Sequence, residues 1–168
     1  PELSGQFLQI LNCNINSQKD NDPVFSGRFE KLDLIGHEGT TANATLQGAH
    51  VEYYAKSTPT LAANGNAKLT LSGSNTVTHT HQEKYAVTID ENSKLTITGS
   101  GSLTATAPAK VVSLDYDSVL DVAGGTVSVS TTSTDGTTSV GIYSDGGPIQ
   151  VSGGKLNISG AKYGLATG

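Results

Sequence analysis

The sequence predicts an all-β fold, a right-handed parallel β-helix built from coils of about 25 residues with three short strands each. Three observations support this prediction. Four similar segments follow one another, and their shared glycines recur about 25–29 residues apart: Gly73, Gly99, Gly124 and Gly153. Within each segment apolar residues alternate with Ser and Thr, which is typical of a strand with one buried face. The 168 residues are only 35% hydrophobic and include 20 glycines, which suits a thin solenoid better than one wide core.

Each coil is expected to contain three strands in a fixed order. The first strand is expected at residues 69–71, 95–97, 119–122 and 149–151. A glycine that follows it permits a sharp bend. The second strand should then occupy residues 76–78, 102–105, 126–129 and 155–158. The third strand is expected at residues 60–61, 86–89, 111–114, 140–142 and 163–165.

The repeat divides the chain into two parts. Residues 1–40 show no clear repeat and are expected to form an N-terminal cap or an irregular first coil. Residues 41–168 form the β-helix coils, and we expect them to be truncated at the C-terminus because a new repeat has just begun at Tyr163. The single cysteine, Cys13, is expected to be a small buried apolar residue.

Charge and hydropathy argue against two classes of partner. The formal net charge is −5, and Arg28 is the only arginine among ten Lys and Arg residues, so binding to nucleic acid is not expected. No run of 18 apolar residues is present, so no membrane span is expected either.

Residues 69–77, 95–105 and 149–159 resemble the repeats of secreted bacterial right-handed parallel β-helix proteins that bind carbohydrate. The resemblance covers roughly residues 42–168. It implies an extracellular or cell-surface protein with calcium at the coil turns. It also implies affinity for acidic plant polysaccharides such as polygalacturonate.

An acidic column is predicted along one edge of the solenoid. When the third strands are aligned on Leu61, Val87, Val112 and Ile142, the same offset of three residues selects Asn64, Asp90, Asp115 and Asp145. Carboxylates stacked about 5 Å apart repel each other by about 3 kcal/mol per pair at an effective dielectric constant near 20. Calcium, which prefers six to eight oxygen ligands, could relieve that repulsion, with Glu91 and Asp117 nearby in the sequence. The alternative is that turns simply favour Asp and Asn.

Three tyrosines are predicted to bind a sugar ligand. Tyr116 lies between Asp115 and Asp117, and Tyr85 and Tyr143 flank the same edge. Aromatic rings beside acidic or metal-bearing turns suit sugars, which present C–H faces together with hydroxyls. The alternative is that these rings only cover the apolar interior.

His79 and His81 would place both imidazoles on one face of an extended segment. A transition-metal pair and an exposed loop pair are the two interpretations, and two ligands without a third favour the exposed pair.

The leading functional hypothesis is a non-catalytic protein that binds acidic polysaccharide, with calcium as the cofactor. Enzyme activity is not expected, because a lyase of this shape needs a basic residue near calcium, and Arg28 lies outside the regular repeats. The alternative is a structural surface protein, an adhesin stalk or filament subunit that self-associates through its solenoid ends. In that case residues 7–15 could add a strand to a neighbour's open edge.

Overall fold

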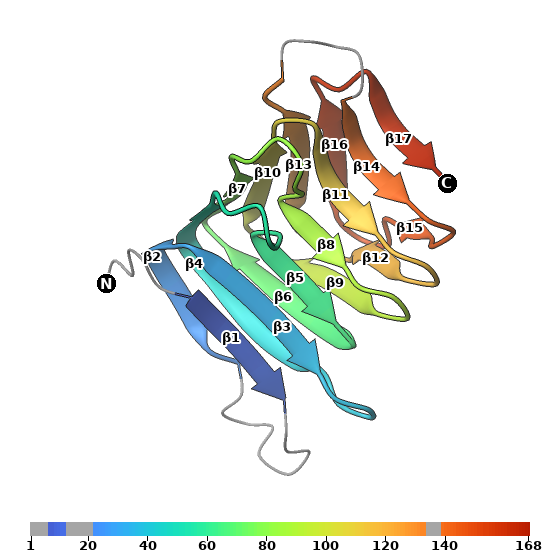
Figure 1. Ribbon diagram of the computed structural model, residues 1–168. Helices are drawn as coiled ribbons and strands as arrows, with labels where there is room; N and C mark the ends of the chain where they lie inside the picture. Colours follow the sequence, from blue (N-terminus) through green and yellow to red (C-terminus); the bar gives the residue numbers. More distant parts are fainter. Residues whose placement is uncertain (1–6, 13–21, 134–138) are drawn as a thin grey trace.

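Every regular element that the computed structural model describes is a β-strand, and every pairing between these strands is parallel (Figure 1). The structure describes residues 7–12, 22–133 and 139–168. Paired strands lie about 26 residues apart in the sequence, as expected for coils stacked on one another. The predicted parallel β-solenoid is confirmed, and its arrangement is consistent with a right-handed β-helix.

The third strands form a seven-stranded sheet. Its order is β1 (Phe7–Asn12), β3 (Lys31–Gly36), β5 (Leu61–Asn64), β8 (Val87–Ile89), β11 (Lys110–Leu114), β14 (Val140–Ser144) and β17 (Tyr163–Thr167). The four predicted alignment residues are in register across these strands, as Leu61 pairs with Val87, Val87 with Val112 and Val112 with Ile142. The sequence alignment of the third strands is therefore confirmed.

The first and second strands of each coil form a ten-stranded sheet. Its order is β15 (Ile149–Gln150), β12 (Val119–Val122), β9 (Lys94–Gly99), β6 (Asn66–Ser72), β4 (Ala42–Tyr53), β7 (Ser74–His79), β10 (Ser102–Ala107), β13 (Thr126–Thr131) and β16 (Lys155–Ser159), with β2 (Val24–Phe29) also beside β4. The long strand β4 pairs with β6 along its first half and with β7 along its second. In this coil one continuous strand thus occupies the positions that two separate strands occupy in the later coils.

Residues 24–36, which carry no clear repeat, lie in the same two sheets as the later coils. β2 pairs with β4, with a register shift between Phe25 and Gly27, and β3 pairs with both β1 and β5. The backbone of β1 therefore extends its own chain's sheet. Cys13 and residues 13–15 lie outside the described residues.

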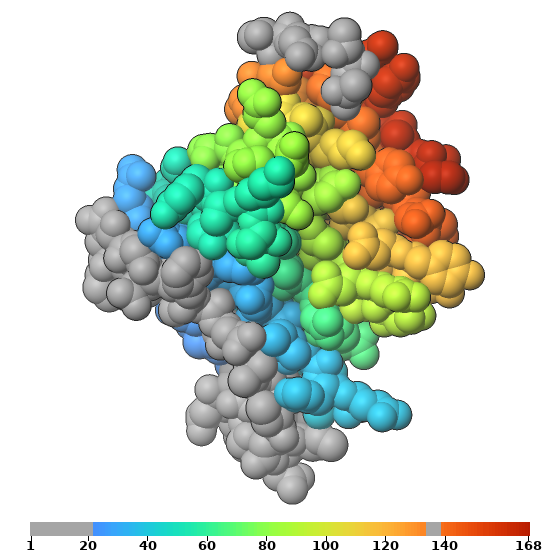
Figure 2. Space-filling model, viewed as in Figure 1, coloured from blue at the N-terminus to red at the C-terminus, as the bar shows by residue number. Residues whose placement is uncertain are grey.

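The core is a narrow stack of small aliphatic side chains. Leu61, Val87, Val112 and Ile142 are all at most 4% exposed, and Phe29 is the only phenylalanine in the buried cluster of the described residues. Burying one such aliphatic side chain contributes about 1.5–3 kcal/mol. The coils stack in chain order along the solenoid, from blue to red in Figure 2. Since every regular element in the described ranges is a strand, none of them offers a helix that could cross a membrane.

Candidate functional site

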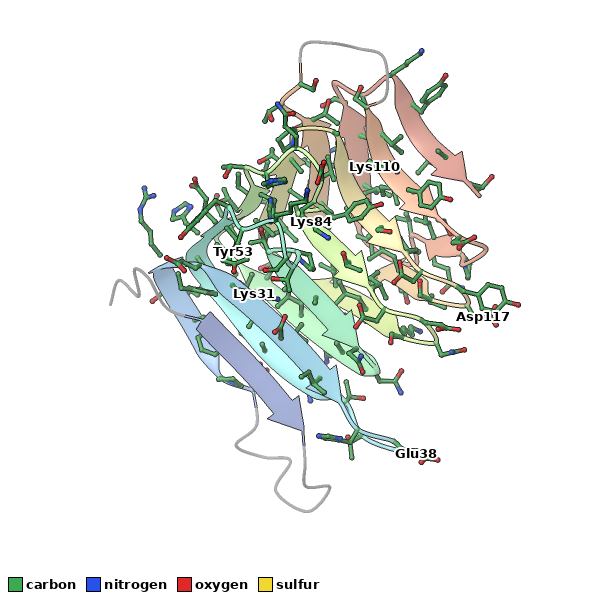
Figure 3. The ribbon with its side chains drawn as sticks, viewed as in Figure 1. Lys31, Glu38, Tyr53, Lys84, Lys110 and Asp117 are labelled. Carbon is green, nitrogen blue, oxygen red and sulfur yellow. The ribbon has the colours of Figure 1, made fainter. Side chains whose placement is uncertain are left out.

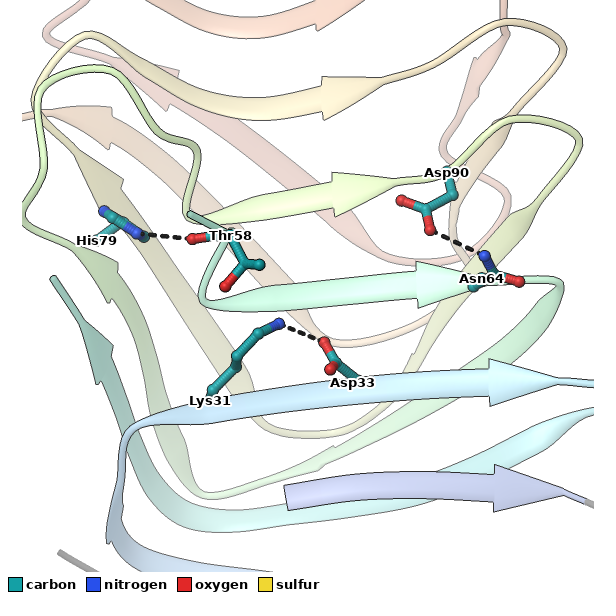
Figure 4. A network of polar contacts seen from close by, with 6 residues as sticks. All are labelled: Lys31, Asp33, Thr58, Asn64, His79 and Asp90. Carbon is teal, nitrogen blue, oxygen red and sulfur yellow. Dashed lines mark hydrogen bonds and ion pairs between the residues drawn. The ribbon is translucent and has the colours of Figure 1, made fainter. Parts of the chain in front are cut away.

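The predicted acidic column lies where neighbouring strands of the seven-stranded sheet end. The backbone N–H groups of Asp90, Asp115 and Asp145 donate to carbonyl oxygens of the preceding coil, over 2.9, 3.0 and 2.9 Å respectively. Asn64 donates through Nδ2 to Oδ2 of Asp90 at 3.0 Å (Figure 4). The structure therefore brings the four residues into one ladder, because each begins a turn at the same point of its coil.

Two of these turns share one conformation. The N–H of Ser93 donates to the carbonyl of Asp90, and the N–H of Ser118 donates to that of Asp115, both at 3.1 Å. The third residue of each turn is left-handed, with φ 54° at Asn92 and 52° at Asp117. Asn and Asp tolerate this region better than other non-glycine residues, so turn geometry alone accounts for Asp117.

Asp115 lies at the electrostatic centre of the column. Its pKa is raised, chiefly by partial burial and then by the negative charge of Asp90, with smaller effects from Asp145 and Glu91. The Ser113 hydroxyl, 3.4 Å from Oδ1 of Asp115, acts in the opposite direction. Ionised Asp115 is therefore destabilised by its surroundings, which a bound cation would offset.

We expect Asp115→Asn to raise the melting temperature slightly at neutral pH. The pKa of Asp115 is higher in the folded than in the unfolded chain, so the folded state loses stability as pH rises through the folded pKa. Asparagine removes this charge, and the gain should vanish below about pH 3.8, where the unfolded chain also holds the proton. Thermal unfolding at neutral pH and at a pH below that limit measures the two differences in melting temperature. Glu52→Gln is the control, because Glu52 is exposed. A lower melting temperature for the variant at neutral pH would contradict it.

The column fits a hard cation only in part. Within the described residues, no three Asp, Glu, His or Cys side chains lie close enough together to enclose a metal ion. The Asp90 and Asp115 carboxylates supply the oxygen ligands that calcium prefers. Further ligands would have to come from backbone carbonyls, water or a bound sugar acid.

Tyr85 and Tyr143 lie on either side of a lysine that the sequence analysis did not single out. The Nζ atom of Lys110 lies 6.0 Å from the ring centroid of Tyr85 and 5.2 Å from that of Tyr143. Figure 3 shows Lys110 at the beginning of β11, at the other end of the strand from the turn that holds Asp117. The sequence could have indicated Lys110, because the third-strand alignment puts it at the same position as Tyr85. Lys110 stands two residues before Val112, and Tyr85 stands two residues before Val87, which pairs with Val112.

Tyr143 connects the lysine to the acidic column. A Cβ atom added at Gly168 would lie 2.6 Å from the Tyr143 hydroxyl and 2.9 Å from Oδ1 of Asp145, so both groups lie beside Gly168. Tyr143 thus has Lys110 near its ring and Asp145 near its hydroxyl. Tyr116 is separate from this group, because it lies in the turn after β11, where it is 58% exposed.

The interpretation of His79 and His81 as an exposed pair is wrong. His79 is only 1% exposed, because it ends β7 beside the Tyr53 ring, which it meets edge-on. Its Nε2 lies 3.0 Å from the Thr58 carbonyl (Figure 4), and its Nδ1 accepts a hydrogen bond from the N–H of His81 at 3.0 Å. His79 therefore serves as a structural link between two loops.

No protein-family model, curated protein or solved structure matches this chain, so the case for a function depends on the site itself.

Proposed function

We propose that this protein is a non-catalytic binder of acidic polysaccharide, which it holds on the outer face of the seven-stranded sheet. The observation that carries the proposal is the position of the Lys110 ammonium between Tyr85 and Tyr143. Tyrosine rings offer faces for the C–H groups of a sugar and hydroxyls for hydrogen bonds. A lysine between them supplies the positive charge that a uronate carboxylate needs.

Calcium is the proposed cofactor. The protein carries a formal net charge of −5, which repels a polyanion at long range. A cation bound between column carboxylates, such as those of Asp90 and Asp115, would reverse that repulsion locally and could also bind a sugar carboxylate. The raised pKa of Asp115 supports this role, because partial burial and the negative charge of Asp90 both disfavour its ionised form, which a bound cation would stabilise. With such a ligand, we propose an extracellular or cell-surface location for the protein.

The proposal is tested by retention on immobilised polygalacturonate, with calcium and with a calcium chelator. We expect the protein to be retained with calcium and released by the chelator. Tyr143→Ala should weaken retention by about tenfold, which corresponds to about 1.4 kcal/mol and lies within the range for a ring contact. Tyr54→Ala is the matched control, because Tyr54 is 67% exposed and lies outside the seven-stranded sheet.

Two results would contradict the proposal. One is the absence of retention with calcium, and the other is an equal loss in the Tyr54 and Tyr143 variants. Sedimentation of the same samples addresses the structural alternative, because end-to-end polymers without retention would favour a filament or stalk.

A further inference from the structure

A small pocket opens beside Lys110, between the loops of two neighbouring coils. Its volume is about 190 Å³, and its lining residues are Gln82, Glu83, Lys84, Tyr85, Ala109 and Lys110. The first four lie in the loop between β7 and β8, and the last two lie where β11 begins. Figure 3 shows Lys84 and Lys110 on this same side of the molecule.

The pocket carries a local positive charge on an acidic protein. Its one carboxylate, that of Glu83, pairs with Lys56 at 2.7 Å, which lowers the pKa of Glu83. Neither Lys84 nor Lys110 pairs with a carboxylate in the described part of the chain, where the ion pairs are Lys31–Asp33 and Lys56–Glu83. Two ammonium groups are thus available to one compact anion.

Backbone hydrogen bonds hold the loop that carries Lys84 and Tyr85. The N–H of Thr80 donates to the carbonyl of Tyr53 at 3.0 Å, and the N–H of Lys84 donates to that of His81 at 3.2 Å. His81 also accepts from the N–H of Glu83 through Nδ1 at 3.1 Å. A loop held in this way loses little conformational entropy on binding, which favours the binding of a small ligand.

We propose that this pocket binds one sugar residue that carries an anionic group, at the end or on a branch of the polysaccharide. Lys84 and Lys110 hold the anionic group, and Tyr85 contacts the sugar ring. The pocket is smaller than the 300–1,000 Å³ usual for small-molecule sites, so it fits a single residue and not a chain that passes through. The inference rests on the proposed polysaccharide-binding function. It adds a site for the end of the polysaccharide chain, next to the surface that carries Tyr143.

Calorimetric titration with three monosaccharides tests the proposal. D-galacturonate carries a carboxylate, galactose 6-sulfate carries a sulfate ester, and galactose is neutral. We expect at least one of the two anionic sugars to bind and galactose to bind at least tenfold more weakly. Binding of the carboxylate alone, the sulfate alone or both identifies which anion the pocket accepts, and each of these results supports the proposal.

Two variants distinguish the pocket from the general charge of the surface. Lys84→Gln should weaken binding of the preferred anionic sugar about tenfold, whereas Lys68→Gln should leave it unchanged, because Lys68 is exposed on β6 of the other sheet. Equal effects of the two substitutions would overturn the proposal. So would the absence of binding by both anionic sugars, or equal binding of galactose.

The experiment also separates failure of this inference from failure of the proposed function. If the wild-type protein is retained on polygalacturonate but binds neither anionic monosaccharide, only the proposal about the pocket is overturned. If the protein binds an anionic monosaccharide, Lys84→Gln weakens that binding about tenfold and the protein is not retained on the polymer, only the polysaccharide function is overturned.

Discussion

Gly65→Ala is expected to lower the free energy of unfolding by roughly 3–5 kcal/mol, at the upper end of the range for single substitutions. Gly65 has φ +74°, where an L side chain costs about 1–2 kcal/mol. The larger part is steric, since a Cβ atom there would lie 2.0 Å from the carbonyl oxygen of Gly36 in the preceding coil. Neither backbone can move freely, because β3 and β5 are paired up to this turn.

The chain contains a matched control for this prediction. Gly39 has φ +75°, and a Cβ atom added there meets nothing within 4 Å. Gly39→Ala therefore carries the backbone strain alone and should cost about 1–2 kcal/mol. Urea unfolding followed by circular dichroism gives both values, and equal losses in the two variants would show that contact between coils contributes nothing at Gly65.

The periodic part of the fold could be predicted from the sequence because one coil is copied onto the next. A glycine at each bend and an apolar residue at every second strand position are local features that recur at a fixed interval. Aligning Leu61 with Val87 was therefore enough to place Asn64 beside Asp90, as the structure shows.

Features that depend on contacts between loops could not be predicted in the same way. Residues 24–36 join both sheets through backbone pairing, which tolerates a sequence without the repeat. His79 is adjacent to a polar loop in the sequence, yet Tyr53 and Thr58 from the preceding coil bury it. The alignment that gives the acidic column also puts Lys110 at the same offset as Tyr85, but these two residues precede the aligned positions, whereas the column follows them.

The second large effect is expected at His79, as a loss of stability on acidification. The pKa of His79 is lowered, chiefly by burial and further by the charges of His81 and Lys84, which together outweigh its hydrogen bonds to the backbone of Thr58 and Ala55. The unfolded chain, with an imidazole pKa near 6.5, therefore binds more protons than the folded chain below neutrality. The stability that neutral His79 contributes is complete above about pH 6.5 and is lost as pH falls through the folded pKa.

His79→Gln should remove this contribution to the pH dependence. Glutamine stays neutral on acidification but cannot reproduce both hydrogen bonds of the imidazole, so the variant should lose about 1–3 kcal/mol at neutral pH. Urea midpoints between about pH 7.5 and 5 should then fall less steeply than in the wild type. His50→Gln is the control, because His50 is exposed and its Nδ1 lies 3.0 Å from the Thr76 hydroxyl.

Hydrogen exchange locates the expected change within the molecule. Protonated His79 carries a hydrogen on Nδ1, so it can no longer accept from the N–H of His81, and that amide should exchange faster in acid after correction for intrinsic rates. Two results together would contradict the prediction: a pH dependence of the urea midpoint that His79→Gln does not change, and exchange of the His81 amide that does not speed up in acid. The acid sensitivity would then belong to other groups. The expected result would instead make one buried imidazole the acid-sensitive support of the loop that carries Lys84 and Tyr85.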